Sequence, residues 1–131
     1  MPDLVYTFPY NNNYTPAMPV IELVFSLPKR NQPDLTIMAL LDSGSDGTML
    51  PVYLLDKIGA KPVGQGGVRG ILGYSRSVDL YLIKLYIGPH QLHAIRVIGI
   101  DTDEEPIVGR NALNHLIITL NGLANVTEVA G

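Results

Sequence analysis

The chain has 131 residues, of which 47% are apolar and 16% charged, with a net charge of −3 and no cysteine. This length and composition predict one globular domain with a real core and exclude a disordered chain. The lack of cysteine excludes disulfides and thiolate metal sites, and the lack of a basic cluster argues against nucleic acid as the main partner.

The first part of the chain is predicted to be an irregular arm followed by a β-hairpin. Residues 1–19 carry four prolines and three consecutive asparagines, which favour a loop or arm. Residues 20–27 and 35–41 are short apolar runs rich in β-forming residues, and the segment between them contains two prolines, as turns often do. These two runs therefore predict a hairpin.

The middle of the chain is predicted to alternate turns with a single short helix. Residues 42–47, Asp-Ser-Gly-Ser-Asp-Gly, are expected to form a tight loop. Residues 51–58 predict a helix with Pro51 in its first turn and Gly59 just past its end. A glycine-dense stretch at 64–73 follows.

The last part of the chain is predicted to contain a second hairpin and a closing strand. The hairpin joins residues 78–87 to 91–100, an acidic turn spans 101–105, a helical piece spans 110–115, and the strand spans 116–120. Many short strands with little helix predict an all-β, small closed barrel-like domain with one or two short helices. We expect an arm at 1–19, the domain at 20–122 and a tail at 123–131.

The tripeptide Asp42-Ser43-Gly44 is the candidate for chemistry, because it directly follows an apolar strand. A carboxylate at this place leaves a buried strand and enters a loop, where it is available to act. The Ser43 hydroxyl can bond backbone across the loop, and Gly44 permits a sharp turn. Taken alone, the tripeptide is also what an ordinary turn contains.

Three segments in order resemble the retropepsins, the retroviral and retroviral-like aspartic proteases. Residues 39–46 are similar to their active-site strand and loop, and residues 68–74 to their glycine-rich flap. Residues 106–113, Pro-Ile-Val-Gly-Arg-Asn-Ala-Leu, are similar to the signature Ile-Ile-Gly-Arg-(Asn/Asp)-x-Leu, the most specific element of the family. Residues 119–121 are similar to its C-terminal strand. The resemblance covers residues 20–122 and implies the acid-protease fold.

The resemblance implies roles for individual residues. Asp42 matches the catalytic aspartate, and Ser43 and Gly44 match the pair that locks the loops of two chains together. Asp46 and Arg110 match an Asp–Arg pair that ties the active-site loop to the C-terminal helix, with Arg110 as structural support. Ser43 stands where retroviral enzymes usually carry Thr, which implies a looser lock.

The resemblance also implies a substrate site and excludes a metal or other cofactor from the mechanism. The residues expected to contact substrate are Asp46, Gly70, Ile71, Leu72 and Gly73. The arm at 1–19 and the tail after residue 122 have no obvious counterpart in the family, whose chain ends form part of the dimer sheet.

A single Asp-Ser-Gly implies two chains, because aspartic proteolysis needs two carboxylates that share a proton. We therefore expect a homodimer that holds a polypeptide in extended form and hydrolyses it with a water activated between two Asp42 carboxylates. The alternative is a catalytically silent dimerisation or peptide-binding module of the same fold. The intact tripeptide argues against that alternative, since a binder does not need the carboxylate.

Other site types fit the sequence less well. A calcium loop starting at Asp42 would have Gly44 at its third position and Tyr53 at its twelfth, where Asp/Asn and Glu are needed. The glycines at 64–73 follow no phosphate-binding pattern, and Ser43 and Ser45 lack a nucleophile motif. The histidines, which are His90, His93 and His115, lack metal-ligand spacing.

Two charged features have an ordinary explanation beside a functional one. The acidic turn at 101–105 is expected to be solvated, although its acids could also touch a basic substrate residue. Arg110 could be a surface arginine at a helix start, and its place after Gly109 is what favours a structural role. No apolar run approaches the ~18 residues of a membrane span and no signal-like start is present, so we expect a cytoplasmic protein without a membrane partner.

Overall fold

The computed structural model describes residues 5–30, 35–69, 73 and 75–131. Strands dominate these ranges, and both helices are short. The elements in chain order are β1 (Tyr6–Pro9), β2 (Val20–Ser26), β3 (Leu35–Leu41), β4 (Thr48–Pro51), α1 (Val52–Lys57), β5 (Gly64–Arg69), β6 (Ser75–Ile87), β7 (His90–Ile100), β8 (Ile107–Val108), α2 (Arg110–Leu113), β9 (Ile117–Asn121) and β10 (Val126–Ala130).

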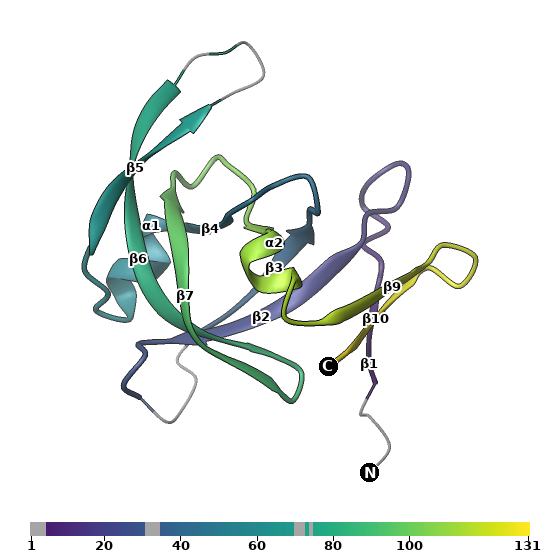
Figure 1. The fold of residues 1–131 in the computed structure, drawn as a ribbon. Coiled ribbons are helices and arrows are strands. Elements are labelled where there is room, and N and C mark those ends of the chain that lie inside the picture. The colour runs from purple at the N-terminus through teal and green to yellow at the C-terminus, as the bar shows by residue number, and fades with distance from the viewer. Residues whose placement is uncertain (1–4, 31–34, 70–72, 74) are drawn as a thin grey trace.

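The larger of the two sheets curls into a small barrel (Figure 1). Its strand order is β2-β3-β8-β4-β7-β6-β5, and β2 also pairs with β6. The first six strands in this order therefore form a closed ring, and β5 pairs with β6 outside the ring. The predicted all-β, barrel-like domain with one or two short helices is confirmed. Among the described residues, no helix is long and apolar enough to cross a membrane.

Alternating side chains explain why the predicted hairpins form. In β2, Ile21, Leu23 and Phe25 are fully buried while Glu22 between them is exposed, as a strand with one face on the core requires. β2 pairs antiparallel with β3, and β6 pairs antiparallel with β7, so both predicted hairpins are confirmed.

The core fills the barrel and continues under α1. The largest fully buried side chains are Tyr81, Phe25, Ile21, Leu23, Leu50, Leu55, Ile83, Leu85, Ile87, Val97, Val108 and Val129. Leu55 belongs to α1, which begins after Pro51 and is followed by Gly59 at a φ of +83°. A positive φ favours glycine, so the predicted helix with its two punctuating residues is confirmed.

The chain ends form a second sheet that the sequence did not predict. β1 pairs antiparallel with β10, and β10 pairs with β9, so both parts expected to be an arm or a tail contribute a strand. Phe8 on β1 and Val129 on β10 belong to the hydrophobic core. The burial of these two side chains was not predicted, because the N-terminal sequence is rich in proline and the C-terminal segment is short.

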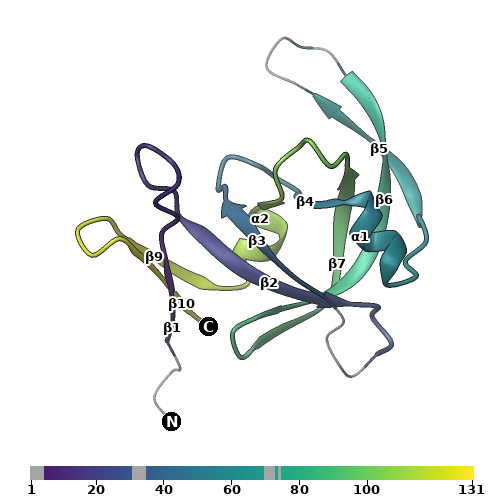
Figure 2. The same cartoon turned by 180° about the vertical axis from the view of Figure 1, so that it is seen from behind.

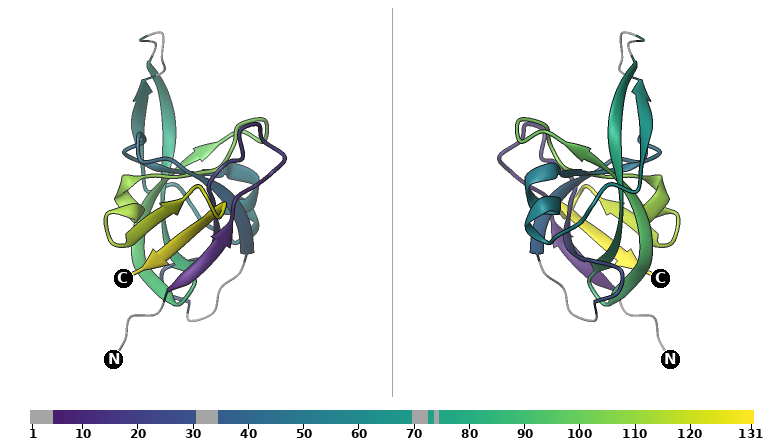
Figure 3. Two further views of the ribbon diagram at one scale, coloured as in Figure 1. Left: turned by 90° about the vertical axis from the view of Figure 1, so that its right-hand side faces the viewer. Right: turned by 90° about the vertical axis from the view of Figure 1, so that its left-hand side faces the viewer.

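The hairpin of β5 and β6 rises away from the barrel. Figure 2 shows it from behind, and in both edge-on views of Figure 3 it extends beyond the other strands. The ladder between β6 and β7 starts at Leu80, whereas β5 pairs with β6 from Ser75 to Leu80. Residues 75–79 therefore have a strand partner on one side only.

Candidate active site

Asp42 is placed by the end of β3. Leu40 and Leu41 pair in parallel with Ile107 and Val108 of β8, and the backbone N–H of Asp42 donates to the Val108 carbonyl at 3.1 Å. The Asp42 side chain is half-buried. A short, partly buried strand thus fixes the point at which the aspartate leaves the sheet.

The loop that Asp42 begins is braced by its own hydrogen bonds. The Gly44 N–H donates to Asp42 Oδ1 at 2.9 Å, and the Ser45 N–H donates to the Asp42 carbonyl at 3.1 Å. The Ser45 hydroxyl donates to the Gly47 carbonyl at 2.8 Å. These contacts are the local turns that Asp and Ser favour, and they fix the orientation of the Asp42 carboxylate.

The start of α2 lies directly against this loop. The Arg110 N–H donates to the Ser45 carbonyl at 2.8 Å, and a Cβ on Gly109 would lie 2.9 Å from that same oxygen and closer still to the Gly47 carbonyl. Since real Cβ atoms do not approach backbone so closely, only glycine fits at position 109. The glycine of the 106–113 signature therefore has a packing reason.

A buried threonine that the sequence did not single out joins the same elements. Thr48 is fully buried, and its hydroxyl donates to Asn111 Oδ1 at 2.8 Å and accepts from the Gly109 N–H at 3.1 Å. The Asn111 amide in turn donates to the Arg96 carbonyl at 2.7 Å. Asn111 was part of the recognised signature, but no local pattern marked Thr48 as its partner.

No family model matches the sequence, and no curated protein matches it significantly. A retropepsin-like aspartic protease from Rickettsia conorii superposes with a TM-score of 0.66, covering 99% of this chain and 94% of that one at 11% identity. The EIAV protease in complex with the inhibitor HBY-793 gives a TM-score of 0.57, covering 75% and 86% of the two chains at 17% identity. The chain has the retropepsin fold.

The predicted ion pair between Asp46 and Arg110 is not formed in this structure. Their side chains form no ion pair, and both are exposed. The Arg110 guanidinium donates instead to the Ser43 carbonyl at 2.8 Å. The guanidinium is thus engaged by a backbone carbonyl, and Asp46 contacts α2 through its own backbone carbonyl, which accepts from the Asn111 N–H at 3.3 Å. The retropepsin-like loop is thus tied to α2 through carbonyl groups.

The other residues expected at the site are in part outside the described structure. Gly70, Ile71 and Leu72 lie outside the described residues, while Gly73 is exposed and has a φ of +81°. Ser43 and Gly44 are exposed, so in one chain this end of the retropepsin fold is open.

A shallow pocket lies beside the loop. It has a volume of ≈ 210 Å³ and is lined by Asp46, Gly47, Leu80, Arg96, Ile98 and Asn111. Asp42 does not line it.

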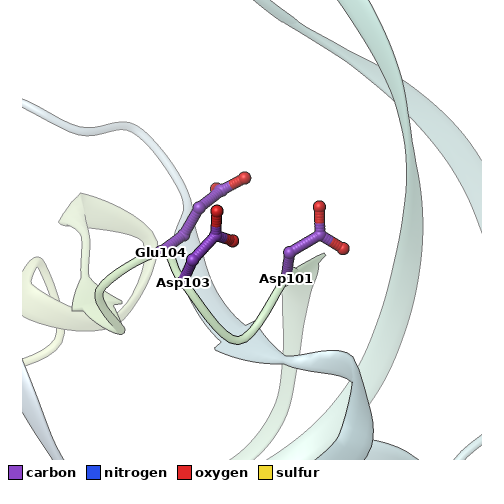
Figure 4. Close-up of side chains that lie close together, drawn as sticks. All are labelled: Asp101, Asp103 and Glu104. Carbon is purple, nitrogen blue, oxygen red and sulfur yellow. The ribbon is translucent and has the colours of Figure 1, made fainter.

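The acidic turn at 101–105 is confirmed as a turn and carries three neighbouring carboxylates, shown in Figure 4. Oxygens of Asp101, Asp103 and Glu104 lie within 4.8 Å of one another. Arg76 binds both Glu104 oxygens, at 2.8 and 2.7 Å, and this hydrogen bond lowers the pKa of Glu104. Because a guanidinium already holds the Glu104 carboxylate, the group does not present three free ligands to a cation.

The neighbouring residue of the same turn also has a partner. The Tyr14 hydroxyl donates to Glu105 Oε1 at 2.7 Å, and this hydrogen bond raises the pKa of Tyr14. The acidic turn therefore contacts β6 on one side and the N-terminal loop on the other.

Proposed function

We propose that this chain is an aspartic endopeptidase that acts as a homodimer, in which a water held between two Asp42 carboxylates attacks the peptide bond. The observation that carries the proposal is the setting of Asp42. Its carboxylate is oriented by the Gly44 N–H in a loop fixed against α2, within a retropepsin fold. An acid or base needs this kind of fixed position to transfer a proton to or from a bound substrate.

Two chains supply what one chain lacks. One carboxylate accepts a proton from the attacking water while the other donates a proton to the carbonyl oxygen, and a tetrahedral gem-diol results. Two carboxylates about 3 Å apart share one proton, because both cannot be ionised cheaply at that distance. This chain contains a single Asp-Ser-Gly, and the exposed Ser43 and Gly44 are available to meet a second copy.

The second sheet offers a surface for that association. β9 is an edge strand of this sheet, and Ile117 and Leu120 on it are 61% and 53% exposed. An apolar edge strand with unpaired backbone groups favours pairing with another strand. A second copy of the chain, presenting the same edge, is a suitable partner.

The proposed substrate is a polypeptide in extended form. The β5–β6 hairpin stands beside the open end of the barrel, where an extended segment between hairpin and loop could bond to backbone as an added strand does. No covalent intermediate is involved, because the nucleophile is water.

Cleavage of a peptide library by the wild type and by Asp42→Asn tests the proposal. We expect the variant to remain folded and dimeric and to lose activity by several orders of magnitude, since the water loses its base. Wild-type activity should be highest at acidic pH and insensitive to EDTA. A wild type that binds peptides as tightly as the variant and cleaves none would establish the silent peptide-binding module instead.

A further inference from the structure

The described part of the hairpin stem buries Val78 but pairs with only one neighbouring strand. Residues 75–79 of β6 pair with β5 and have no strand partner in β7, whose ladder with β6 begins at Leu80. A pocket of ≈ 200 Å³ lies at this place and is lined by Val52, Arg76, Ser77, Val78, Asp79, Gly99, Ile100 and Asp101. Packing is therefore incomplete where the stem leaves the barrel.

One ion pair spans this place. The Arg76 guanidinium donates from Nη1 and Nη2 to the two oxygens of Glu104, at 2.8 and 2.7 Å. Such a bidentate pair fixes direction as well as distance. Within the described ranges, it is the one side-chain hydrogen bond or ion pair recorded between residues 75–79 and the rest of the chain.

Glu104 of this ion pair lies close in sequence to the residues that hydrogen-bond to the end of β3 and to Asp42. Glu104 lies two residues before Pro106, whose carbonyl accepts from the Leu40 N–H at 2.9 Å. β8 follows, and its Val108 carbonyl accepts from the Asp42 N–H. The ion pair thus joins the stem to the short loop that precedes β8, the strand paired with the end of β3.

The neighbouring carboxylates strengthen the attraction on the Arg76 side. Asp101 and Asp103 raise the pKa of Arg76 after the larger effects of Glu104, and their oxygens lie near those of Glu104. Without Arg76 the three carboxylates would repel one another, and the turn would be expected to open. The acidic turn is in this view the anionic half of a contact within the chain.

We propose that Arg76 and Glu104 are positioning residues that set the direction of the β5–β6 hairpin relative to the Asp42 loop, and with it the affinity for an extended peptide. This inference rests on the proposed peptidase function. Neither residue touches the reacting atoms, so the pair should act on substrate binding and leave the chemical step unchanged.

The test measures Arg76→Gln, Glu104→Gln and the double variant in two ways. Amide hydrogen exchange reports opening of residues 64–69 and 75–79 without any substrate, and steady-state cleavage gives KM and kcat separately. We expect exchange of the stem and KM each to rise by about two- to fivefold in either single variant, the range for an exposed ion pair, with kcat unchanged. The double variant should resemble the single ones, because both remove the same contact.

Matched controls separate this contact from a change in charge. Lys61→Gln and Glu22→Gln alter the net charge by the same amounts at exposed sites away from the pair and should behave like the wild type. Arg76→Lys keeps the positive charge but cannot donate from two nitrogens of one planar group, so its exchange rate and KM should lie between those of the wild type and Arg76→Gln.

Two results would overturn the inference, and they are distinguishable. If the wild type cleaves peptides but the Arg76 and Glu104 variants match it in exchange and in KM, the positioning role is wrong while the peptidase function stands. If the wild type cleaves nothing, the proposed function is wrong and the positioning role goes with it, whatever the exchange data show.

Discussion

The Asp42 loop and the β5–β6 hairpin are held in opposite ways. The loop is fixed by backbone hydrogen bonds, by the buried Thr48 hydroxyl and by a contact at Gly109 too close for any side chain. The stem of the hairpin has a strand partner on one side only, and beside the buried Val78 it is held by a partly exposed ion pair. A catalytic group needs a fixed position, whereas an element that admits a polymer must be able to move. The difference between the two regions is therefore what the proposed activity requires.

Glycine substitutions in the two regions should have very different effects. Gly109→Ala forces a Cβ against the Ser45 and Gly47 carbonyls, so we expect a loss of stability at or above the ~1–3 kcal/mol of ordinary overpacking, together with loss of activity. Gly67→Ala in β5 meets nothing within 4 Å and should change the free energy of unfolding by less than about 1 kcal/mol. Chemical denaturation measures both; equal effects would show that the loop is not tightly held.

The buried hydroxyl beneath the loop should be the next most sensitive point. Thr48→Val leaves the Gly109 N–H and Asn111 Oδ1 without a partner, and we expect a cost of about 1–3 kcal/mol. Thr48→Ser keeps the hydroxyl and should retain most of the stability. A valine variant as stable as the serine variant would show that these hydrogen bonds do not hold the loop.

The exposed contact of Arg110 should matter less. Arg110→Ala removes a hydrogen bond to the Ser43 carbonyl, so we expect a loss of about 0.5–1.5 kcal/mol, while Asp46→Asn should be close to neutral. The two changes should add within about 0.5 kcal/mol, since the side chains form no ion pair. Strong non-additivity in denaturation would restore the Asp46–Arg110 pair that the sequence predicted.

Acid should weaken the contact between Arg76 and Glu104. The hydrogen bond from Arg76 lowers the pKa of Glu104 below its usual 4.5, so its contribution is present above pH 4.5 and is lost as the pH falls through the lowered value. We expect the stability advantage of the wild type over Glu104→Gln to be at most about 1 kcal/mol at pH 7 and to vanish in strong acid. An advantage that does not depend on pH would contradict the ionic nature of the contact.

Sequence patterns correctly predicted the elements that depend on residues close together in the chain. The hairpins, α1 with Pro51 and Gly59, and the acidic turn all follow from alternation, turn residues and helix punctuation. The glycine at 109 was recognised through its motif, and the structure supplies the reason.

Contacts between distant segments were not predictable in the same way. Nothing local shows that β1 joins β10, that Thr48 meets Asn111, or that Arg76 reaches Glu104. The resemblance suggested an ion pair for Arg110, but the side-chain partner depends on how the loop backbone sits against α2. Such partners are set by the tertiary arrangement and become visible only with it.

Mixed dimers test the central claim most directly, namely that each active site takes one Asp42 from each of two chains. The wild type is allowed to exchange subunits with a tenfold excess of Asp42→Asn chains under saturating peptide, and an equal mass of an unrelated protein serves as the control. The account predicts that activity per wild-type chain falls by about tenfold, because most wild-type chains then sit in mixed dimers with a single carboxylate. Activity per wild-type chain that stays constant while exchange is shown to be complete would contradict it.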